Sequence, residues 1–214
     1  LLTLVNSTGN VTFDNYADMG AIERKKDGDY EYVIDTDSHS GTAKKVDVTG
    51  YRFQNNTNAT YASGTDAEVW AGRTKVGNTV TKNKLTVTGG TPTAVYGGIA
   101  ENFEHVTGGT EKPTGDATEN TLILKTGASV TKAYGADVRT LSGNATKNGV
   151  TLAGGTVTGS LYGGALTKAG ATGSATGNTV TITGGTVGGD VYAGYTSGTG
   201  KTTDNTVSLG DGTN

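Results

Sequence analysis

Few residues in this chain could support metal binding or nucleophilic catalysis. His39 and His105 are the only two histidines, and the sequence contains no cysteine. A zinc site needs three or four nitrogen, sulfur or carboxylate ligands, and a catalytic nucleophile needs an adjacent base. We therefore expect both histidines to be ordinary surface residues, and we predict neither a metal site nor a bound cofactor.

Glycine-rich segments and acidic residues are the other candidates for chemistry. Segments such as GGTVGGD lack the Gly-x-Gly-x-x-Gly and Gly-x-x-x-x-Gly-Lys spacings that surround a phosphate with backbone amides.

Cleavage of a glycosidic bond would need two carboxyl groups side by side. Two positions of the repeat described below carry acids, but adjacent repeats do not share their charge. The first position holds Glu68, Ala94, Lys132, Ser160 and Asp190, and the second holds Lys82, Glu119, Lys147, Gly177 and Asp204. We therefore predict that the chain is not an enzyme.

An internal repeat determines which elements position these residues. The stretch 178–194, NTVTITGGTVGGDVYAG, has a close copy at 148–164 and more diverged copies at 120–136 and 83–98. Each copy opens with an asparagine, and successive asparagines are separated by 37, 28, 30 and 27 residues. These asparagines are Asn83, Asn120, Asn148, Asn178 and Asn205. The motif Gly-x-Ala-Thr-x-Asn closes the preceding loop at 115–120, 143–148 and 173–178.

Hydrophobic periodicity identifies the elements within each copy. Apolar residues alternate with Thr, Ser or Lys, as in Val180 and Ile182 or Val150 and Leu152. A period of two indicates strands with one buried face, and Gly-Gly pairs interrupt it where the chain would turn a corner. A unit of about 27–30 residues is too short for a propeller blade of ~40–45 residues. The pattern predicts an all-β fold, a single-stranded parallel β-helix with one coil per repeat.

Stacking of the coils explains why the copies resemble one another. Coils stacked at ~4.8 Å place equivalent side chains directly above one another. Inward Val, Leu and Ile side chains would then form the core. The opening asparagines would form a structural ladder in which each amide bonds to the next coil.

Aromatic residues occupy a second set of equivalent positions, each directly after an apolar residue. If the apolar residue points inward, its aromatic neighbour points outward, and the aromatic side chains form a ridge along the solenoid. This aromatic ridge consists of Trp70, Tyr96, Tyr134, Tyr162 and Tyr192. Two interpretations are open: cross-coil stacking worth about 0.5–1.5 kcal/mol per pair, or a strip that binds sugars or partner proteins.

The repeat divides the chain into two parts. Residues 46–214 form the predicted repetitive β-helix, with a loop insertion at 99–117 and a last coil that is truncated at its C-terminal end. Residues 1–45 are less regular: residues 1–13 alternate like a strand or two, and residues 14–40 are charged. There we expect irregular coils or a partial cap, with room for a short helix in 15–26.

Charge and hydropathy limit the partners. The 17 basic and 20 acidic residues are interspersed and give a net charge of −3, so no basic surface is expected that would bind nucleic acid. No apolar run approaches the ~18 residues of a membrane-spanning helix. We therefore predict no nucleic-acid partner and no membrane insertion of this segment.

The phrase NTVTITGGTVGGDVYAG, with its Gly-Gly corners and its Val-Tyr close, resembles the repeated passenger regions of bacterial autotransporters, the type V secreted proteins. The resemblance is to the long Thr/Gly/Asn-rich passengers of adhesin-type members and covers residues 77–214 best. It implies a right-handed parallel β-helix, exposure at the bacterial cell surface after export across the outer membrane, and a role in adhesion.

Three functions follow as hypotheses. The first is an extracellular structural and adhesive segment, whose partner is a protein or glycan on a host or bacterial surface. The second is a subunit that self-associates head to tail through its terminal coils into an extracellular filament, since the first and last strands are apolar and lack a neighbour. The third is a polysaccharide-active β-helix enzyme, for which aligned acids would be required.

Overall fold

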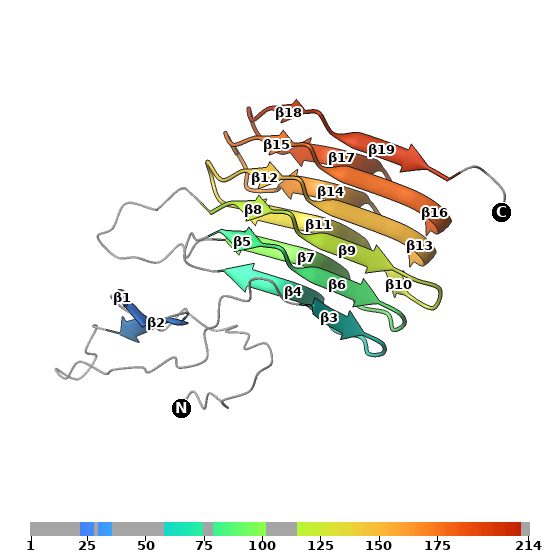
Figure 1. Cartoon of the computed structure of the whole chain (residues 1–214), viewed down its shortest axis with the longest axis horizontal. Coiled ribbons are helices and arrows are strands. Elements are labelled where there is room, and N and C mark those ends of the chain that lie inside the picture. Colours follow the sequence, from blue (N-terminus) through green and yellow to red (C-terminus); the bar gives the residue numbers. More distant parts are fainter. Residues whose placement is uncertain (1–21, 28–29, 36–57, 75–78, 102–114, 211–214) are drawn as a thin grey trace. The chain divides into compact units, whose positions relative to one another are not determined.

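A computed structural model describes residues 22–27, 30–35, 58–74, 79–101 and 115–210 of the chain. The chain divides into two compact units, and each is described by itself. One unit contains an antiparallel pair of strands, and the other is an all-β parallel solenoid of about five turns, as the repeat predicts. Figure 1 shows the coils of the solenoid stacked one on another from β3 to β19.

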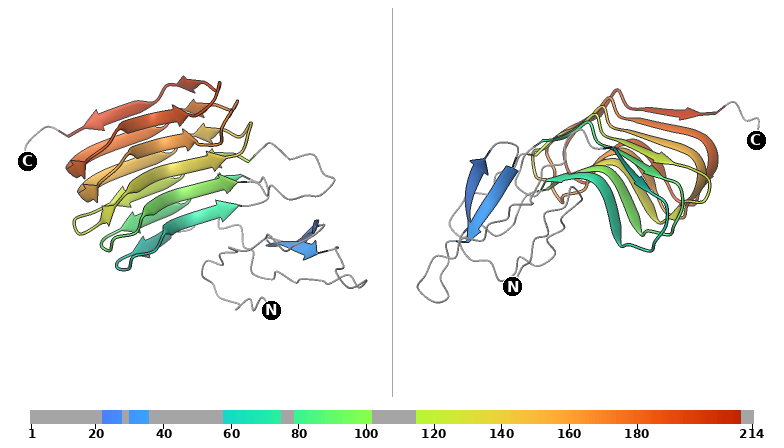
Figure 2. Two further views of the ribbon diagram at one scale, coloured as in Figure 1. Left: turned by 180° about the vertical axis from the view of Figure 1, so that it is seen from behind. Right: turned by 60° about the horizontal axis from the view of Figure 1, so that its bottom comes forward.

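Three parallel sheets form the walls of the solenoid (Figures 1 and 2). Sheet 1 contains β3 (Asn58–Tyr61), β6 (Lys84–Val87), β9 (Thr121–Leu124), β13 (Gly149–Val157), β16 (Thr179–Val187) and β19 (Thr206–Leu209), with β10 (Ser129–Val130) paired to β13. Sheet 2 contains β4 (Glu68–Thr74), β7 (Ala94–Glu101), β11 (Lys132–Arg139), β14 (Leu161–Leu166) and β17 (Val191–Thr196). Sheet 3 contains β5 (Val80–Thr81), β8 (Ala117–Thr118), β12 (Ala145–Thr146), β15 (Ala175–Thr176) and β18 (Thr202–Thr203).

The registers between coils confirm the alignment of the repeats. In sheet 1, Leu122 lies opposite Val150, and Val150 lies opposite Val180. All three side chains are at most 1% exposed, so this inward column forms core, as the alternation predicts. A second apolar cluster lies behind sheet 3. It contains Ala100, Ala117, Ala136, Val138, Ala145, Leu166, Ala171 and Ala175.

The loop-closing motif Gly-x-Ala-Thr-x-Asn has a structural reason at each fixed position. Its alanine points into the second apolar cluster, and its threonine occupies the outward face of sheet 3. Its glycine lies where successive coils approach most closely, since a Cβ on Gly173 would overlap the carbonyl oxygen of Gly143. The same overlap recurs between Gly143 and Gly115 and between Gly200 and Gly173.

Replacing Gly173 with alanine should therefore lower the free energy of unfolding by about 2–3 kcal/mol, because a rigid backbone carbonyl blocks the new methyl group. Gly149→Ala is the matched control, since its Cβ would meet only the Thr179 hydroxyl at 2.9 Å. Urea denaturation monitored by far-ultraviolet circular dichroism measures both variants. Equal unfolding midpoints for the two would show that the close approach of the coils is not stabilising.

The position before each ladder asparagine has a left-handed backbone. Gly177 there has a φ of 65°, and the equivalent non-glycine residues have φ between 54° and 57°. They are Lys82, Glu119, Lys147 and Asp204. This conformation turns the chain from sheet 3 to sheet 1, and the amide of Lys147 still donates to Thr176 O at 3.0 Å. Left-handed geometry is unfavourable for a residue that has a Cβ.

Replacing Lys147 with glycine should raise the free energy of unfolding by about 0.5–1 kcal/mol, because glycine adopts this φ without a steric penalty. Lys147→Ala separates this effect from loss of the charged side chain, since alanine retains the Cβ. We expect the alanine variant to be no more stable than the native chain. A higher urea midpoint for the alanine variant would show that the gain in stability comes from removing the lysine charge.

Residues 1–45, where we expect irregular coils or a partial cap with room for a short helix, contain two described strands. These are β1 (Ile22–Asp27) and β2 (Tyr30–Asp35), which pair antiparallel. The register places Asp27 opposite Tyr30, so only Gly28 and Asp29 connect them, a dipeptide suited to a two-residue hairpin. The other residues of 1–45 and residues 46–57 lie outside the described structure.

The loop insertion is shorter than predicted. Strand β7 continues through Glu101, and β8 begins at Ala117, so both ends of the predicted insertion 99–117 belong to the solenoid. Strand β7 continues through Gly97 and Gly98, so this Gly-Gly pair does not end the strand. Residues 102–114 lie outside the described part of the chain.

Candidate functional site: an asparagine ladder, a tyrosine stack and a charged ring

The five predicted ladder asparagines form one continuous chain of hydrogen bonds. Each side-chain amide Nδ2 donates to the Oδ1 of the asparagine in the following coil, over distances of 2.9, 3.0, 3.1 and 3.0 Å from Asn83 to Asn205. The backbone amides of Asn83, Asn120, Asn148 and Asn178 donate to the same Oδ1 atoms. The first four asparagines are at most 1% exposed.

Every donor of a central ladder amide is used. Asn148, for example, also donates from Nδ2 to Ala117 O at 2.9 Å, and Asn178 donates to Ala145 O at 2.9 Å. A buried polar group without partners would destabilise the fold, whereas a fully bonded one specifies a single arrangement. The ladder therefore fixes the register of the coils, which is the structural role predicted for these residues.

The predicted aromatic ridge exists as a column, but its rings stack on one another. The ring centroids of Tyr96 and Tyr134 are 4.9 Å apart, those of Tyr134 and Tyr162 are 4.6 Å apart, and those of Tyr162 and Tyr192 are 5.3 Å apart. The interplanar angles are 10°, 5° and 11°, so each inner ring has a tyrosine on both faces. Tyr195 meets Tyr162 and Tyr192 edge-on, at 70° and 61°.

Exposure along the aromatic ridge is uneven. Trp70, Tyr96 and Tyr134 are only 4–6% exposed, whereas Tyr162 and Tyr192 are partly exposed. A sugar ring packs against an aromatic face, and the faces of the inner rings are already covered. Tyr162, an inner ring, therefore presents its edge and hydroxyl group outward, whereas Tyr192 ends the stack and has a stacked tyrosine on one face only. The Tyr192 hydroxyl donates to Asp190 Oδ2 at 3.1 Å.

A closed ring of four charged side chains lies on the outer face of sheet 2. Arg73 donates to Glu101 Oε1 at 2.6 Å and to Glu68 Oε2 at 3.1 Å. Arg139 donates to the remaining oxygens, Glu68 Oε1 at 3.0 Å and Glu101 Oε2 at 3.3 Å. Each carboxylate thus bridges both guanidinium groups, and the charged ring connects strands β4, β7 and β11 of three successive coils.

Asp137 and Tyr96 extend the charged ring. Arg139 Nε donates to Asp137 Oδ2 at 2.7 Å, and the Thr167 hydroxyl donates to Asp137 Oδ1 at 2.6 Å. Arg139 Nη2 also donates to the Tyr96 hydroxyl at 3.0 Å, and its guanidinium carbon lies 5.2 Å from the Tyr96 ring centroid. The charged ring and the tyrosine stack are therefore one connected structure.

Burial and charge shift the pKa values in opposite directions within this cluster. Burial alone would raise the pKa of Glu68, but the charges and hydrogen bonds of Arg139 and Arg73 outweigh it and hold the pKa below its ordinary value. Burial raises the pKa of Asp137 above its ordinary value, against the opposing effects of Arg139 and Thr167. Burial likewise raises the pKa of Tyr96 and of Tyr134.

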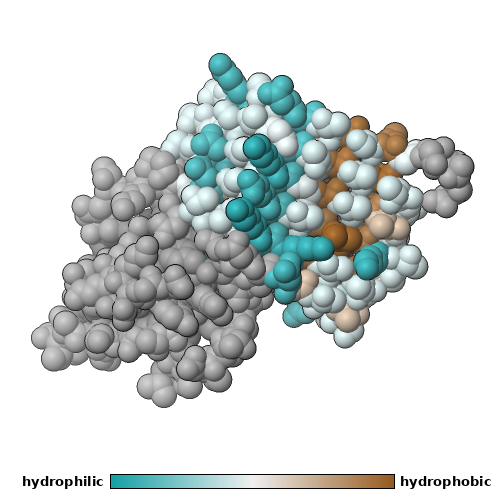
Figure 3. Space-filling view, viewed as in Figure 1, coloured by the Kyte–Doolittle hydropathy of each residue, from teal (hydrophilic) through white to brown (hydrophobic). Residues whose placement is uncertain are grey.

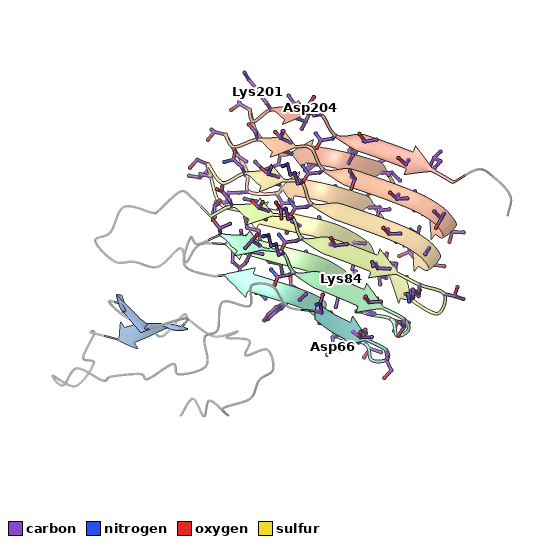
Figure 4. All side chains as sticks on the ribbon, viewed as in Figure 1. Asp66, Lys84, Lys201 and Asp204 are labelled. Atoms are coloured by element: carbon purple, nitrogen blue, oxygen red, sulfur yellow. The ribbon has the colours of Figure 1, made fainter. Side chains whose placement is uncertain are left out.

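The acids singled out in the sequence do not meet in the structure. Asp190 and Asp204 are exposed on the last coils, and Lys201 and Asp204 project near β18 in Figure 4. Figure 3 shows hydrophilic side chains along a band that crosses the coils on the face viewed in Figure 1. Exposed charges before the ladder asparagines alternate in sign from Lys82 to Glu119 to Lys147. His39 and His105 lie outside the described residues.

The charged ring was missed in the sequence. Asp137 and Arg139 lie three and five residues after Tyr134, and Arg73 lies three after Trp70. Extending the repeat alignment past the aromatic position would have placed these charges on one face. Within the described ranges, no three His, Cys, Asp or Glu side chains are placed to hold a metal ion. The same part of the chain contains no helix that is long and apolar enough to cross a membrane.

Comparison with family models, curated proteins and solved structures finds no match to this chain.

Proposed function

We propose that the chain is an extracellular structural and adhesive β-solenoid segment of a bacterial surface protein, which attaches to proteins or glycans on a host or bacterial surface. The observation that carries this proposal is the contrast between inward and outward columns. The inward column of sheet 1 keeps Leu85, Leu122, Val150 and Val180, and the ladder keeps asparagine. The position before each ladder asparagine changes from coil to coil, and its four charged side chains are exposed. It contains Lys82, Glu119, Lys147, Gly177 and Asp204.

This contrast suits a scaffold that varies its surface. Repeating the inward residues maintains the stacking, because the stability of a solenoid depends on contacts between neighbouring coils. Exposed residues can change without loss of the fold. The polar atoms of the charged ring bind one another, which supports a structural role for it and not the polysaccharide-active alternative. Partner contact is then expected at the partly exposed hydroxyl edges of the aromatic ridge.

Adhesion can be measured by coating beads with the full chain and counting those retained on epithelial and bacterial cells under flow. The test variant replaces Tyr162 and Tyr192 with phenylalanine, because this change preserves ring stacking and removes only the hydroxyl groups. We expect retention above that of albumin-coated beads, and a several-fold loss in the double variant. No retention by the native chain on any cell type would contradict an adhesive function. Retention unchanged by the double variant would place contact away from the aromatic ridge.

A second candidate is a head-to-tail extracellular filament. Val207 and Leu209 of β19 continue the inward columns of sheet 1 and are 45% and 74% exposed. A further coil supplied by another copy would bury both side chains and pair the strand edge. Light scattering and electron microscopy of the purified chain test this alternative. Fibres one solenoid wide would support it, and a monomer at all concentrations would exclude it.

A further inference from the structure

We propose that Asn148–Gly149 is a latent site of spontaneous deamidation, which the folded ladder keeps closed and which prevents refolding once it has reacted in the unfolded chain. Asn148 is the only asparagine in the sequence that is followed by glycine. The other ladder asparagines are followed by Lys84, Thr121, Thr179 and Thr206. The proposal holds whether or not the chain is adhesive.

The reaction needs no cofactor or oxidant. The backbone nitrogen of Gly149 attacks Cγ of Asn148, the new N–Cγ bond forms, and the Cγ–Nδ2 bond breaks. The side-chain nitrogen leaves as ammonia and takes the proton from the attacking amide. Water then opens the cyclic imide to aspartate or to isoaspartate. Glycine favours the attack because it has no Cβ to obstruct the approach and adopts the required backbone angles freely.

In the folded chain, separate hydrogen bonds hold the two reacting groups. Asn148 Oδ1 accepts from the backbone and side-chain amides of Asn120, both at 3.0 Å. Asn148 Nδ2 donates to Asn178 Oδ1 and to Ala117 O, at 3.1 and 2.9 Å. The attacking group, the amide of Gly149, donates to Asn120 O at 2.8 Å. Asn148 is fully buried, so ring closure requires the ladder to open and all these bonds to break.

The products do not fit the ladder. Aspartate at position 148 has no N–H, so it would face Asn178 Oδ1 and Ala117 O with acceptors only, and it would bury a charge. Isoaspartate adds an atom to the main chain directly before β13. That insertion would shift β13 out of register with β9 and β16, which pair on either side of it. Each product therefore opposes refolding of the central coils.

The experiment incubates the full chain at mildly alkaline pH, folded in buffer and unfolded in concentrated urea. Peptide mass spectrometry, with an isoaspartate assay, follows each asparagine over time. In urea we expect reaction at Asn148 well before Asn120 or Asn178. In buffer we expect Asn148 to react at least about 100-fold more slowly, which corresponds to an opening free energy of about 2.8 kcal/mol. On dilution from urea, the fraction that refolds should fall in step with the fraction deamidated.

Two variants complete the test. Gly149→Thr introduces the residue found at this position in three other coils, and its urea-treated chains should refold fully. Asn148→Asp supplies the product directly and should unfold at a much lower urea concentration than the native chain. Equal rates of reaction in the folded and unfolded chain would overturn the protection by the ladder. Normal refolding of chains modified at Asn148, or a native urea midpoint for Asn148→Asp, would overturn the block on refolding.

Discussion

Replacing Arg139 with methionine should lower the free energy of unfolding by about 3–5 kcal/mol, the usual result of removing one partner from a buried ion pair. The variant loses contacts to Glu68, Glu101, Asp137 and the Tyr96 hydroxyl in one step. Asp137 is 3% exposed and would be left with only the Thr167 hydroxyl among its side-chain partners. Urea denaturation at neutral pH measures the change.

Lys132→Met is the matched control for this variant. Lys132 lies on the same strand, β11, but its side chain is exposed. We expect its unfolding free energy to change by no more than about 0.5 kcal/mol, as for most surface substitutions. If both variants unfold at the same urea concentration as the native chain, the charged ring does not stabilise the stacking of the coils.

Replacing Asn178 with aspartate should also lower the free energy of unfolding by about 3–5 kcal/mol at neutral pH. The variant loses the two donations from Nδ2, to Asn205 Oδ1 and Ala145 O, and buries a carboxylate in their place. Burial and the facing acceptors would raise the pKa of the new carboxyl in the folded state above its unfolded value. The part of the destabilisation that comes from the buried charge is therefore full above the folded pKa and disappears as the pH falls below the unfolded pKa. The part that comes from lost donors remains, because a protonated carboxyl has one donor in place of two.

Asn205→Asp is the control within the same ladder. Asn205 is partly exposed and donates from Nδ2 only to Ala175 O, so we expect a loss of about 1 kcal/mol. Urea midpoints at neutral and mildly acidic pH compare the two variants. A loss of stability in Asn178→Asp that does not shrink in acid would mean that the buried charge does not contribute to it.

Much of the architecture could be predicted because equivalent residues of successive repeats lie above one another in a solenoid. Asparagines separated by 37, 28, 30 and 27 residues lie in one hydrogen-bonded column, so the insertions fall in loops and leave the stack unchanged. The identity of inward residues follows from alternation for the same reason. The ladder and the core were accessible to sequence analysis because each depends on one repeated position.

Features that combine different positions are harder to predict, because alignment of the repeats gives a shared face but not the pairs of side chains that meet on it. The charged ring joins Glu68, before the aromatic position, to Arg139, five residues after it, across three coils. Such pairs do not repeat, so no periodicity marks them. The ridge was placed correctly along the chain, but the covering of ring faces depends on side-chain rotation, which alternation does not determine. The antiparallel pair β1 and β2 has a local signal in Gly28-Asp29, which lies outside the repeat and carries none of its markers.

All side-chain amides of the asparagine ladder have the same orientation along the solenoid. Each Oδ1 is directed toward the preceding coil, and one N–H group of each of the first four amides is directed toward the following coil. The second N–H group of Asn148 and of Asn178 donates to a backbone carbonyl of the preceding coil. Aligned amide dipoles add, as the peptide dipoles of ~3.5 D do in an α-helix. The solenoid therefore has electrical polarity, with partial positive charge toward its C-terminal coil and partial negative charge toward its N-terminal coil. A coil stacked in the reverse sense would bring like partial charges together, so the ladder favours stacking in which all coils have the same polarity.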